Sequence, residues 1–191
     1  IKTSTPGLEL GTMAYNGSGL FWSDIGGSAN DFVVALLGTK LAFNVGNPNT
    51  TVISASDIVT GEWVHVAAVR ETTAPAISLY INGTLDNRAD HTNGEPLNAQ
   101  ALLVIGGNPL DGRYYTGLID EVKVFDIALS EADIQQAMQV DRGSARSPLP
   151  ADGSADVLGD AVLSWTAGEF AGGHDVYFGT VFDDVNTASR S

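Results

Sequence analysis

"GLIDEVKVF", residues 117–125, places two neighbouring acids, Asp120 and Glu121, inside a run that otherwise has the composition of a β-strand. Acids are poor strand formers and are expensive to bury. The pair could be catalytic, could bind a metal, or could be ordinary surface. The rest of the chain has to distinguish these three explanations.

The first 126 residues have the pattern of an all-β domain. Short runs rich in valine, isoleucine, leucine and aromatic residues alternate with glycine, asparagine, aspartate and proline, and no long stretch has the helical period. This spacing is typical of an antiparallel sandwich or jelly roll. The predicted strands cover residues 32–37, 41–45, 63–69, 77–81, 102–105 and 118–125.

Two of these runs carry more specific signals. In "ISLYINGTL", residues 77–85, Asn82 and Gly83 supply the two positive-φ residues of a type I′ turn, which predicts a tight hairpin. The run "GEWVHVAAVR", residues 61–70, is apolar on both parities and predicts a central strand covered on both faces. His65 lies within it, and we expect a packed, hydrogen-bonded histidine there rather than a metal ligand.

One short helix is predicted after the last strand, in "LSEADIQQAM", residues 129–138. Ser130 is a good N-cap and Asp133 stands at the third helical position, as in a capping box. The apolar stripe that would dock the helix on a sheet is Ile134, Ala137 and Met138. Residues 141–157 then have the composition of a linker. Runs at 160–165 and 174–179 predict a partial second β sandwich over residues 158–191, because about 100 residues make a complete one.

Charge and composition exclude several functions. The chain of 191 residues has 9 basic and 23 acidic residues, and its net charge is -14. Such a balance repels phosphate backbones and anionic membranes, so we expect neither nucleic-acid binding nor membrane insertion. It is compatible with divalent cations and with neutral ligands such as sugars. The chain has no cysteine, which removes disulfides and thiol chemistry.

The runs "GEWVHVAAVR", "SLYINGTL", "LLVIGGNP" and "YYTGLIDEVKVFDIALSEADIQQAM" together resemble a laminin-G-like, concanavalin A-like jelly-roll domain in their order and spacing. The resemblance covers residues 1–140. The tail resembles the opening of fibronectin-III-like or immunoglobulin-like modules in large secreted bacterial proteins, which implies an extracellular or cell-surface location. Relative to the family, the jelly roll lacks one or more N-terminal strands. The sequence could be a fragment, or the strand could come from a separate chain or from neighbouring copies by strand exchange.

We expect no enzymatic activity. Jelly-roll glycoside hydrolases carry a Glu-x-Asp-x-x-Glu strand, whereas the nearest match here, Glu131 and Asp133, stands at the predicted helix start, where acids favour the helix dipole. Neighbouring strand residues point to opposite faces, so Asp120 and Glu121 cannot flank one glycosidic bond. We therefore expect Glu121 to be solvated.

Two binding hypotheses remain. In the family, an aspartate at the position of Asp120 often binds a structural Ca²⁺, a cation that prefers carboxylate and carbonyl oxygens; alternatively, Asp120 only accepts backbone hydrogen bonds at a sheet rim. Binding a sugar or an extracellular protein ligand needs exposed aromatic rings beside polar groups. The alternative is that most aromatic residues of this chain are buried in the core. The candidate ligand-binding residues are Trp22, Asp24, Asp111, Arg113 and Tyr114.

The best interpretation of the sequence is a non-catalytic adhesion or carbohydrate-binding module. The alternative is a structural subunit of an extracellular fibre or surface layer that assembles by strand complementation.

Overall fold

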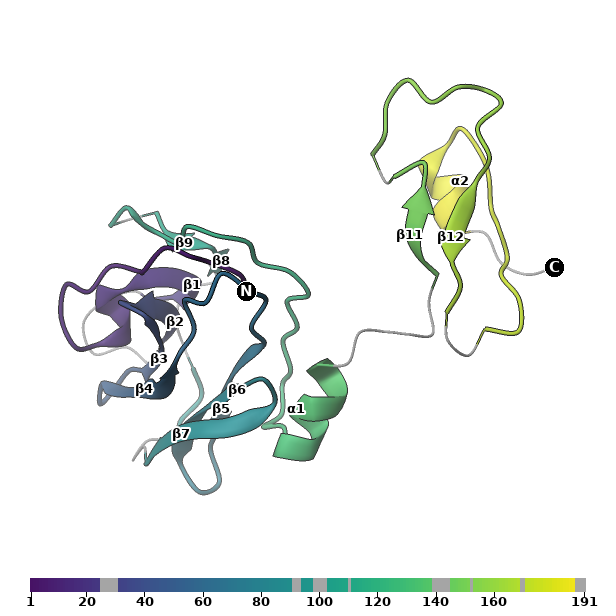
Figure 1. Cartoon of the computed structure of the whole chain (residues 1–191). Coiled ribbons are helices and arrows are strands. Elements are labelled where there is room, and N and C mark those ends of the chain that lie inside the picture. Colours follow the sequence, from purple (N-terminus) through teal and green to yellow (C-terminus); the bar gives the residue numbers. More distant parts are fainter. Residues whose placement is uncertain are drawn as a thin grey trace. The chain divides into compact units, whose positions relative to one another are not determined.

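The structure is a computed structural model, and it describes residues 1–24, 31–90, 94–97, 103–109, 111–138, 145–151, 153–168 and 171–187. The chain divides into two compact units, Ile1–Met138 and Gln139–Ser191. The division lies close to residue 140, where the sequence analysis ended the first domain. Figure 1 shows the first unit as a set of β-sheets with one helix and the second as a small, mostly irregular unit.

The first unit is a β sandwich of two mainly antiparallel sheets, as the sequence predicts. Its larger sheet has the strand order β4-β3-β2-β1-β10-β9, and β8 also pairs with β1. All of its pairs are antiparallel except β1 with β10. The strands are β1 (Ser18–Ser23), β2 (Phe32–Leu37), β3 (Lys40–Val45), β4 (Thr50–Asp57), β8 (Val104–Ile105), β9 (Gly107–Asn108) and β10 (Arg113–Tyr114).

The smaller sheet has the order β5-β6-β7. Its strands are β5 (Val66–Glu71), β6 (Ala76–Ile81) and β7 (Thr84–Asp90). The predicted hairpin between β6 and β7 is confirmed, because Asn82 and Gly83 both have positive φ, at 50° and 79°.

The main core fills the space between the two sheets. Alternation in β2 and β3 directs one set of side chains into it and the other set to the opposite face of the larger sheet. The buried members of this core are Leu20, Leu36, Leu41, Phe43, Val45, Val52, Ile58, Val64, Ile77 and Leu79.

The outer faces of both sheets are also covered. The short 3₁₀ helix η1 (Ala14–Asn16) lies over the larger sheet, where a second cluster comprises Ala14, Trp22, Val33, Ala35, Leu37 and Ala42. Helix α1 (Glu131–Met138) packs on the smaller sheet through Ile134, which contacts Val69 and Tyr80. The predicted helix and its capping box are confirmed: Ser130 Oγ lies 2.6 Å from Asp133 Oδ2, and each residue's backbone N–H is bonded to the other's side chain.

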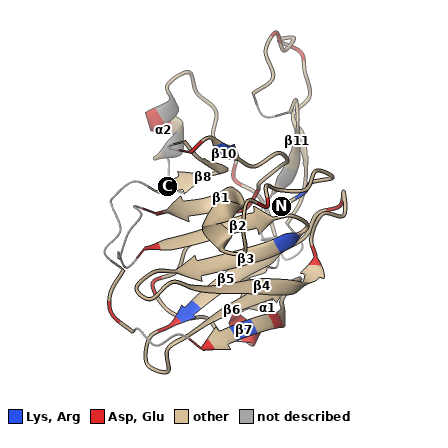
Figure 2. Ribbon diagram, turned by 90° about the vertical axis from the view of Figure 1, so that its left-hand side faces the viewer, with Lys and Arg blue, Asp and Glu red and all other residues tan. Residues whose placement is uncertain are grey.

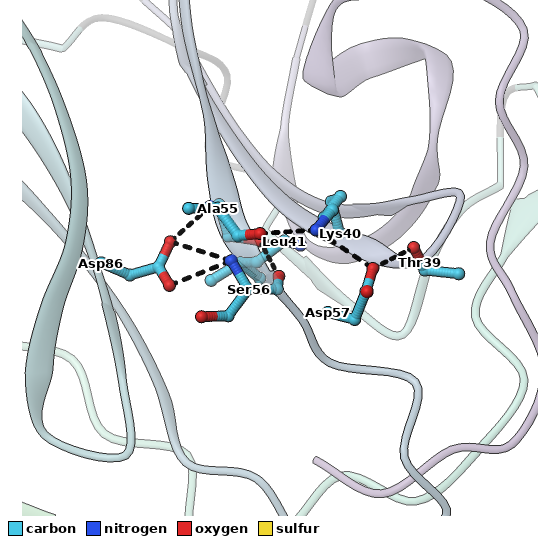
Figure 3. Close-up of polar contacts among 8 residues, drawn as sticks. Thr39, Lys40, Leu41, Ala55, Ser56, Asp57 and Asp86 are labelled. Atoms are coloured by element: carbon cyan, nitrogen blue, oxygen red, sulfur yellow. Dashed lines mark hydrogen bonds and ion pairs between the residues drawn. The ribbon is translucent and has the colours of Figure 1, made fainter.

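Side chains of β7 join the two sheets along one side of the sandwich, and Figure 3 shows the contacts of one of them, Asp86. The carboxylate of Asp86 accepts hydrogen bonds from the backbone N–H groups of Ala55 and Ser56 in β4, at 2.5 and 3.1 Å. The Asn87 amide donates to the carbonyl of Ile53 at 2.8 Å. The Lys40 ammonium bonds to the Ala55 carbonyl next to them. This side of the sandwich is therefore closed by polar contacts.

The predicted strand at 118–125 is not found. Leu118 forms one isolated bridge with Lys2, and residues 119–125 belong to no strand. Glu121 has a φ of 52°, which interrupts a regular pleat. Within the described part of the chain, residues 119–125 make no hydrogen bond from backbone to backbone. The pleat argument that separated Asp120 from Glu121 therefore does not apply, although both side chains are exposed.

The second unit pairs β11 (Arg146–Leu149) with β12 (Ser164–Thr166) and contains the short helix α2 (Phe182–Asn186). Strand β11 lies in the stretch expected to be linker. Strand β12 overlaps the predicted run at 160–165, whereas residues 174–179 are not a strand. The fibronectin-III-like or immunoglobulin-like module stays a prediction. No helix among the described residues is long and apolar enough to cross a membrane.

Candidate functional site

The hairpin of β9 and β10 brings together three of the five candidate ligand-binding residues. Arg113 pairs with Asn108 across the hairpin. The Arg113 guanidinium lies 3.4 Å from Asp111 Oδ2 and also donates to the backbone carbonyl of Tyr15. Since Arg113 is mostly buried and Asp111 is half exposed, the arginine anchors the hairpin while the carboxylate faces solvent.

Tyr114 is the exposed aromatic residue of this hairpin, with 58% of its surface accessible. Its ring lies against Gly107, where a Cβ atom would stand 2.5 Å from the ring. A side chain at residue 107 would therefore displace the ring. The glycine thus gives the tyrosine a flat backbone surface on one side, and the exposed part of the ring remains available to a ligand.

Asn108 completes the arrangement, and the sequence analysis did not identify it. It is 3% exposed, and its side-chain amide donates to Asp111 Oδ2 at 3.0 Å. The amide and the Arg113 guanidinium thus hold the same carboxylate oxygen from two sides. The "GGNP" motif was a usable signal, because an asparagine before proline at the end of a strand often has a structural hydrogen bond. We call Asn108, Asp111, Arg113 and Tyr114 the hairpin patch.

Trp22 is not available to a ligand, which corrects the prediction. It is 3% exposed in β1 and belongs to the cluster beneath η1. The alternation of β1 directs it to the outer face of the larger sheet, but the segment before β1 covers that face. Its ring therefore cannot stack on a sugar. Asp24 follows β1 and is half-buried.

Asp120 is exposed, and its Oδ1 accepts a hydrogen bond from the Glu121 N–H at 2.9 Å. It lies close enough to the chain's amino terminus for its charge to raise the pKa of the Ile1 amino group, against the larger lowering effect of burial. Within the described residues, no three His, Asp or Glu side chains are grouped to hold a metal ion.

Basic residues are few among the described residues. Figure 2 shows the acidic residues of the first unit mainly in loops and at strand ends, with few basic residues between them. The acids that matched a hydrolase motif have structural partners: Asp133 accepts from Ser130, and Glu131 Oε2 accepts from the Leu85 N–H at 3.4 Å. Burial, followed by repulsion from the amino terminus and Lys123, lowers the pKa of His65.

Comparison with known families agrees with the fold. The sequence profile of the concanavalin A-like lectin/glucanases superfamily matches residues 13–135. The chain belongs to this superfamily. Its name covers both binding proteins and hydrolases, so membership leaves these two classes open. No curated protein sequence matches the chain.

Two solved structures are similar to this chain. One is a protein of Bacteroides ovatus ATCC 8483 to which carbohydrate binding is provisionally ascribed; it has a TM-score of 0.52 and 18% identity, over 72% of this chain and 40% of that one. The other is an S-layer domain-containing protein of Clostridium thermocellum ATCC 27405, with a TM-score of 0.36 and 25% identity, over 61% of this chain and 60% of that one. The chain thus spans less than two thirds of either protein, and the first similarity supports the fold alone.

Proposed function

We propose that this chain is a non-catalytic extracellular module that binds a carbohydrate through the hairpin patch. The observation that carries the proposal is the exposed ring of Tyr114, backed by Gly107, in the same hairpin as the half-exposed carboxylate of Asp111. Sugars present apolar C–H faces and hydroxyl donors, which suit an aromatic ring and a carboxylate respectively. In this proposal, a protein is a ligand of the chain only if the hairpin patch binds the glycans attached to that protein.

A binding role fits the acids better than hydrolysis does. A glycoside hydrolase needs two carboxyl groups on either side of one bond, separated by roughly 5–10 Å. The hairpin patch offers Asp111 alone, and the carboxylates of Glu131 and Asp133 are bonded around the start of α1. Non-catalytic recognition is therefore the function that this geometry supports best.

A glycan array tests the proposal directly. The wild-type chain is expected to bind a subset of neutral oligosaccharides, and Tyr114→Ala should lower affinity about tenfold, because an aromatic contact contributes roughly 1–1.5 kcal/mol. Phe178→Ala is the matched control, since Phe178 is an 89% exposed aromatic residue in the second unit. Absence of binding above background, or equal losses in both variants, would refute the proposal.

The proposal also includes a structural calcium ion, bound by Asp120, that stabilises the fold. Calorimetry with CaCl₂ should detect binding to the wild-type chain, and EDTA should lower its melting temperature. Asp120→Asn should remove both effects, because the amide lacks the charge that a hard cation prefers. If the wild-type chain gives neither heat nor a melting shift, Asp120 is only a hydrogen-bond acceptor for the Glu121 N–H.

The second candidate function is that of a structural subunit assembling by strand complementation. One observation favours it: Lys2 forms isolated antiparallel bridges with both Trp63 and Leu118, so its backbone is bonded on two sides at that point. Light scattering over a wide concentration range tests this function. Polymers that grow with concentration would support assembly, whereas monomers throughout would reject it.

A further inference from the structure

The carboxylate of Asp111 is held through only one of its two oxygen atoms. Oδ2 accepts a hydrogen bond from the Asn108 amide at 3.0 Å and lies 3.4 Å from the Arg113 guanidinium. Oδ1 has no hydrogen bond or ion pair with any of the described residues. Because the side chain is 46% exposed, the protein orients the carboxylate through Oδ2 and leaves Oδ1 as an acceptor for a ligand.

Asp111 and Arg113 form a charge pair whose negative member is the more accessible one. The Arg113 side chain is 21% exposed, which is less than half the exposed fraction of Asp111. Its guanidinium also donates to the Tyr15 carbonyl, so part of its hydrogen-bonding capacity is used within the protein. A ligand that approaches the hairpin therefore meets the carboxylate more than the guanidinium.

The exposed ring of Tyr114 lies within electrostatic range of this charge pair. Tyr114 follows Arg113 directly in β10, and three residue steps separate it from Asp111. Three residue steps span at most about 11 Å even in a fully extended chain. The Debye length in 0.1 M salt is about 10 Å, so a charged group on a sugar that stacks on Tyr114 interacts with Asp111.

The sequence around the hairpin contains no other charge. From residue 96 to residue 119, Asp111 and Arg113 are the only charged residues. Two like charges about 7 Å apart, at effective dielectric constants of about 80 to 20, repel enough to lower affinity by about threefold to about 50-fold. The carboxylate of Asp111 is therefore sufficient to decide whether the hairpin accepts an acidic sugar.

We propose that Asp111 is the specificity-determining residue of the hairpin patch, which selects neutral glycans and rejects glycans that carry carboxylate or sulfate groups. Oδ1 accepts a hydrogen bond from a sugar hydroxyl, whereas an anionic group at the same place is repelled. Asn108 and Arg113 hold the carboxylate through Oδ2, so that Oδ1 stays available. This inference rests on the proposed function, because it names the class of glycan that the same patch binds.

The test compares two ligands that differ in one functional group. One is the tightest neutral oligosaccharide of the glycan array, and the other is the same oligosaccharide with a carboxylate in place of one hydroxymethyl or hydroxyl group. Calorimetry in 0.1 M salt should show at least tenfold tighter binding of the neutral form by the wild-type chain. Asp111→Asn should lower this ratio about tenfold, because the amide has the same shape without the charge. Its affinity for the neutral form should stay within about threefold of wild type.

Asp126→Asn is the matched control, because it changes the net charge equally. Asp126 is exposed and has no hydrogen bond or ion pair with any described residue. It precedes α1, and Figure 1 shows α1 at the opposite end of the first unit from β9. This variant should keep the wild-type ratio within about twofold. Asp111→Glu retains the charge and should also keep the ratio, which separates the effect of charge from a change in the hairpin.

The possible results distinguish this inference from the proposed function. If neutral glycans bind but Asp111→Asn leaves the ratio unchanged, or Asp126→Asn lowers it equally, Asp111 does not determine specificity and the proposed function stands. Loss of the ratio in Asp111→Glu, or loss of all glycan binding in Asp111→Asn, would also overturn the inference. Absence of glycan binding by the wild-type chain would refute the proposed function and the inference together.

Discussion

Replacing Ile134 with alanine should separate the contribution of α1 from that of the sheets. Ile134 is 2% exposed and is the one buried residue of the helix, where it packs against Val69 and Tyr80. Truncating a buried isoleucine to alanine typically costs about 2–5 kcal/mol. The helix has only eight residues and can move towards the sheet to close part of the space. We therefore expect a loss of about 2–3 kcal/mol in the free energy of unfolding.

Urea denaturation followed by tryptophan fluorescence measures this loss, since Trp22 lies in the core of the same unit. For a unit of this size, a loss of 2–3 kcal/mol corresponds to a fall of about 6–15 °C in Tm. The control is Ile127→Ala, which removes the same atoms from a side chain that is 67% exposed. It should change stability by less than about 0.5 kcal/mol. Equal effects of the two substitutions would show that α1 does not dock through Ile134.

Three further changes test other parts of the fold. Gly7→Ala should destabilise the first unit by about 1–3 kcal/mol in thermal denaturation, because its Cβ would lie 2.1 Å from the Leu36 carbonyl oxygen, whereas Gly159→Ala meets no atom within 4 Å and should be neutral. Ser130→Ala should cost about 1 kcal/mol by removing the N-cap of α1, and Ser130→Thr should retain most of that stability because its hydroxyl can still bond to the backbone and side chain of Asp133. His65→Gln should reduce the loss of stability on acidification: the folded pKa of His65 is lowered by burial, so the unfolded chain binds the proton more readily and stability falls as pH drops below about 6.5. Denaturation curves of wild type and His65→Gln at pH 7.5 and 5.0 check this, and an equal acid effect in both proteins would contradict the assignment.

Local chemistry made several elements predictable. The hairpin at Asn82 and Gly83 follows from the positive φ that a type I′ turn requires, and α1 follows from its capping box and apolar stripe. Strands β2, β3 and β6 were found within one residue because their apolar runs are bounded by turn residues. In each case the deciding interaction lies within a few residues along the chain.

Features that depend on distant contacts were harder to predict. The segment 118–125 has the composition of a strand, but composition cannot supply the neighbouring edge that would make it one. Trp22 was a reasonable ligand candidate until the fold placed the η1 segment over its face of the sheet. Asp111, Arg113 and Tyr114 were named because they share one loop, and Asn108 was missed because its role depends on pairing across the hairpin.

The most direct test of the binding proposal is to map a bound oligosaccharide on the chain. An isotope-labelled sample titrated with the best ligand from the array should show amide shift changes in residues 107–109 and 111–116 and around Tyr15, whose carbonyl accepts from Arg113. The same titration on Tyr114→Ala should show these changes only at about tenfold higher ligand concentration. Shifts confined to another surface, such as residues 39–57, would contradict the hairpin patch as the site of recognition.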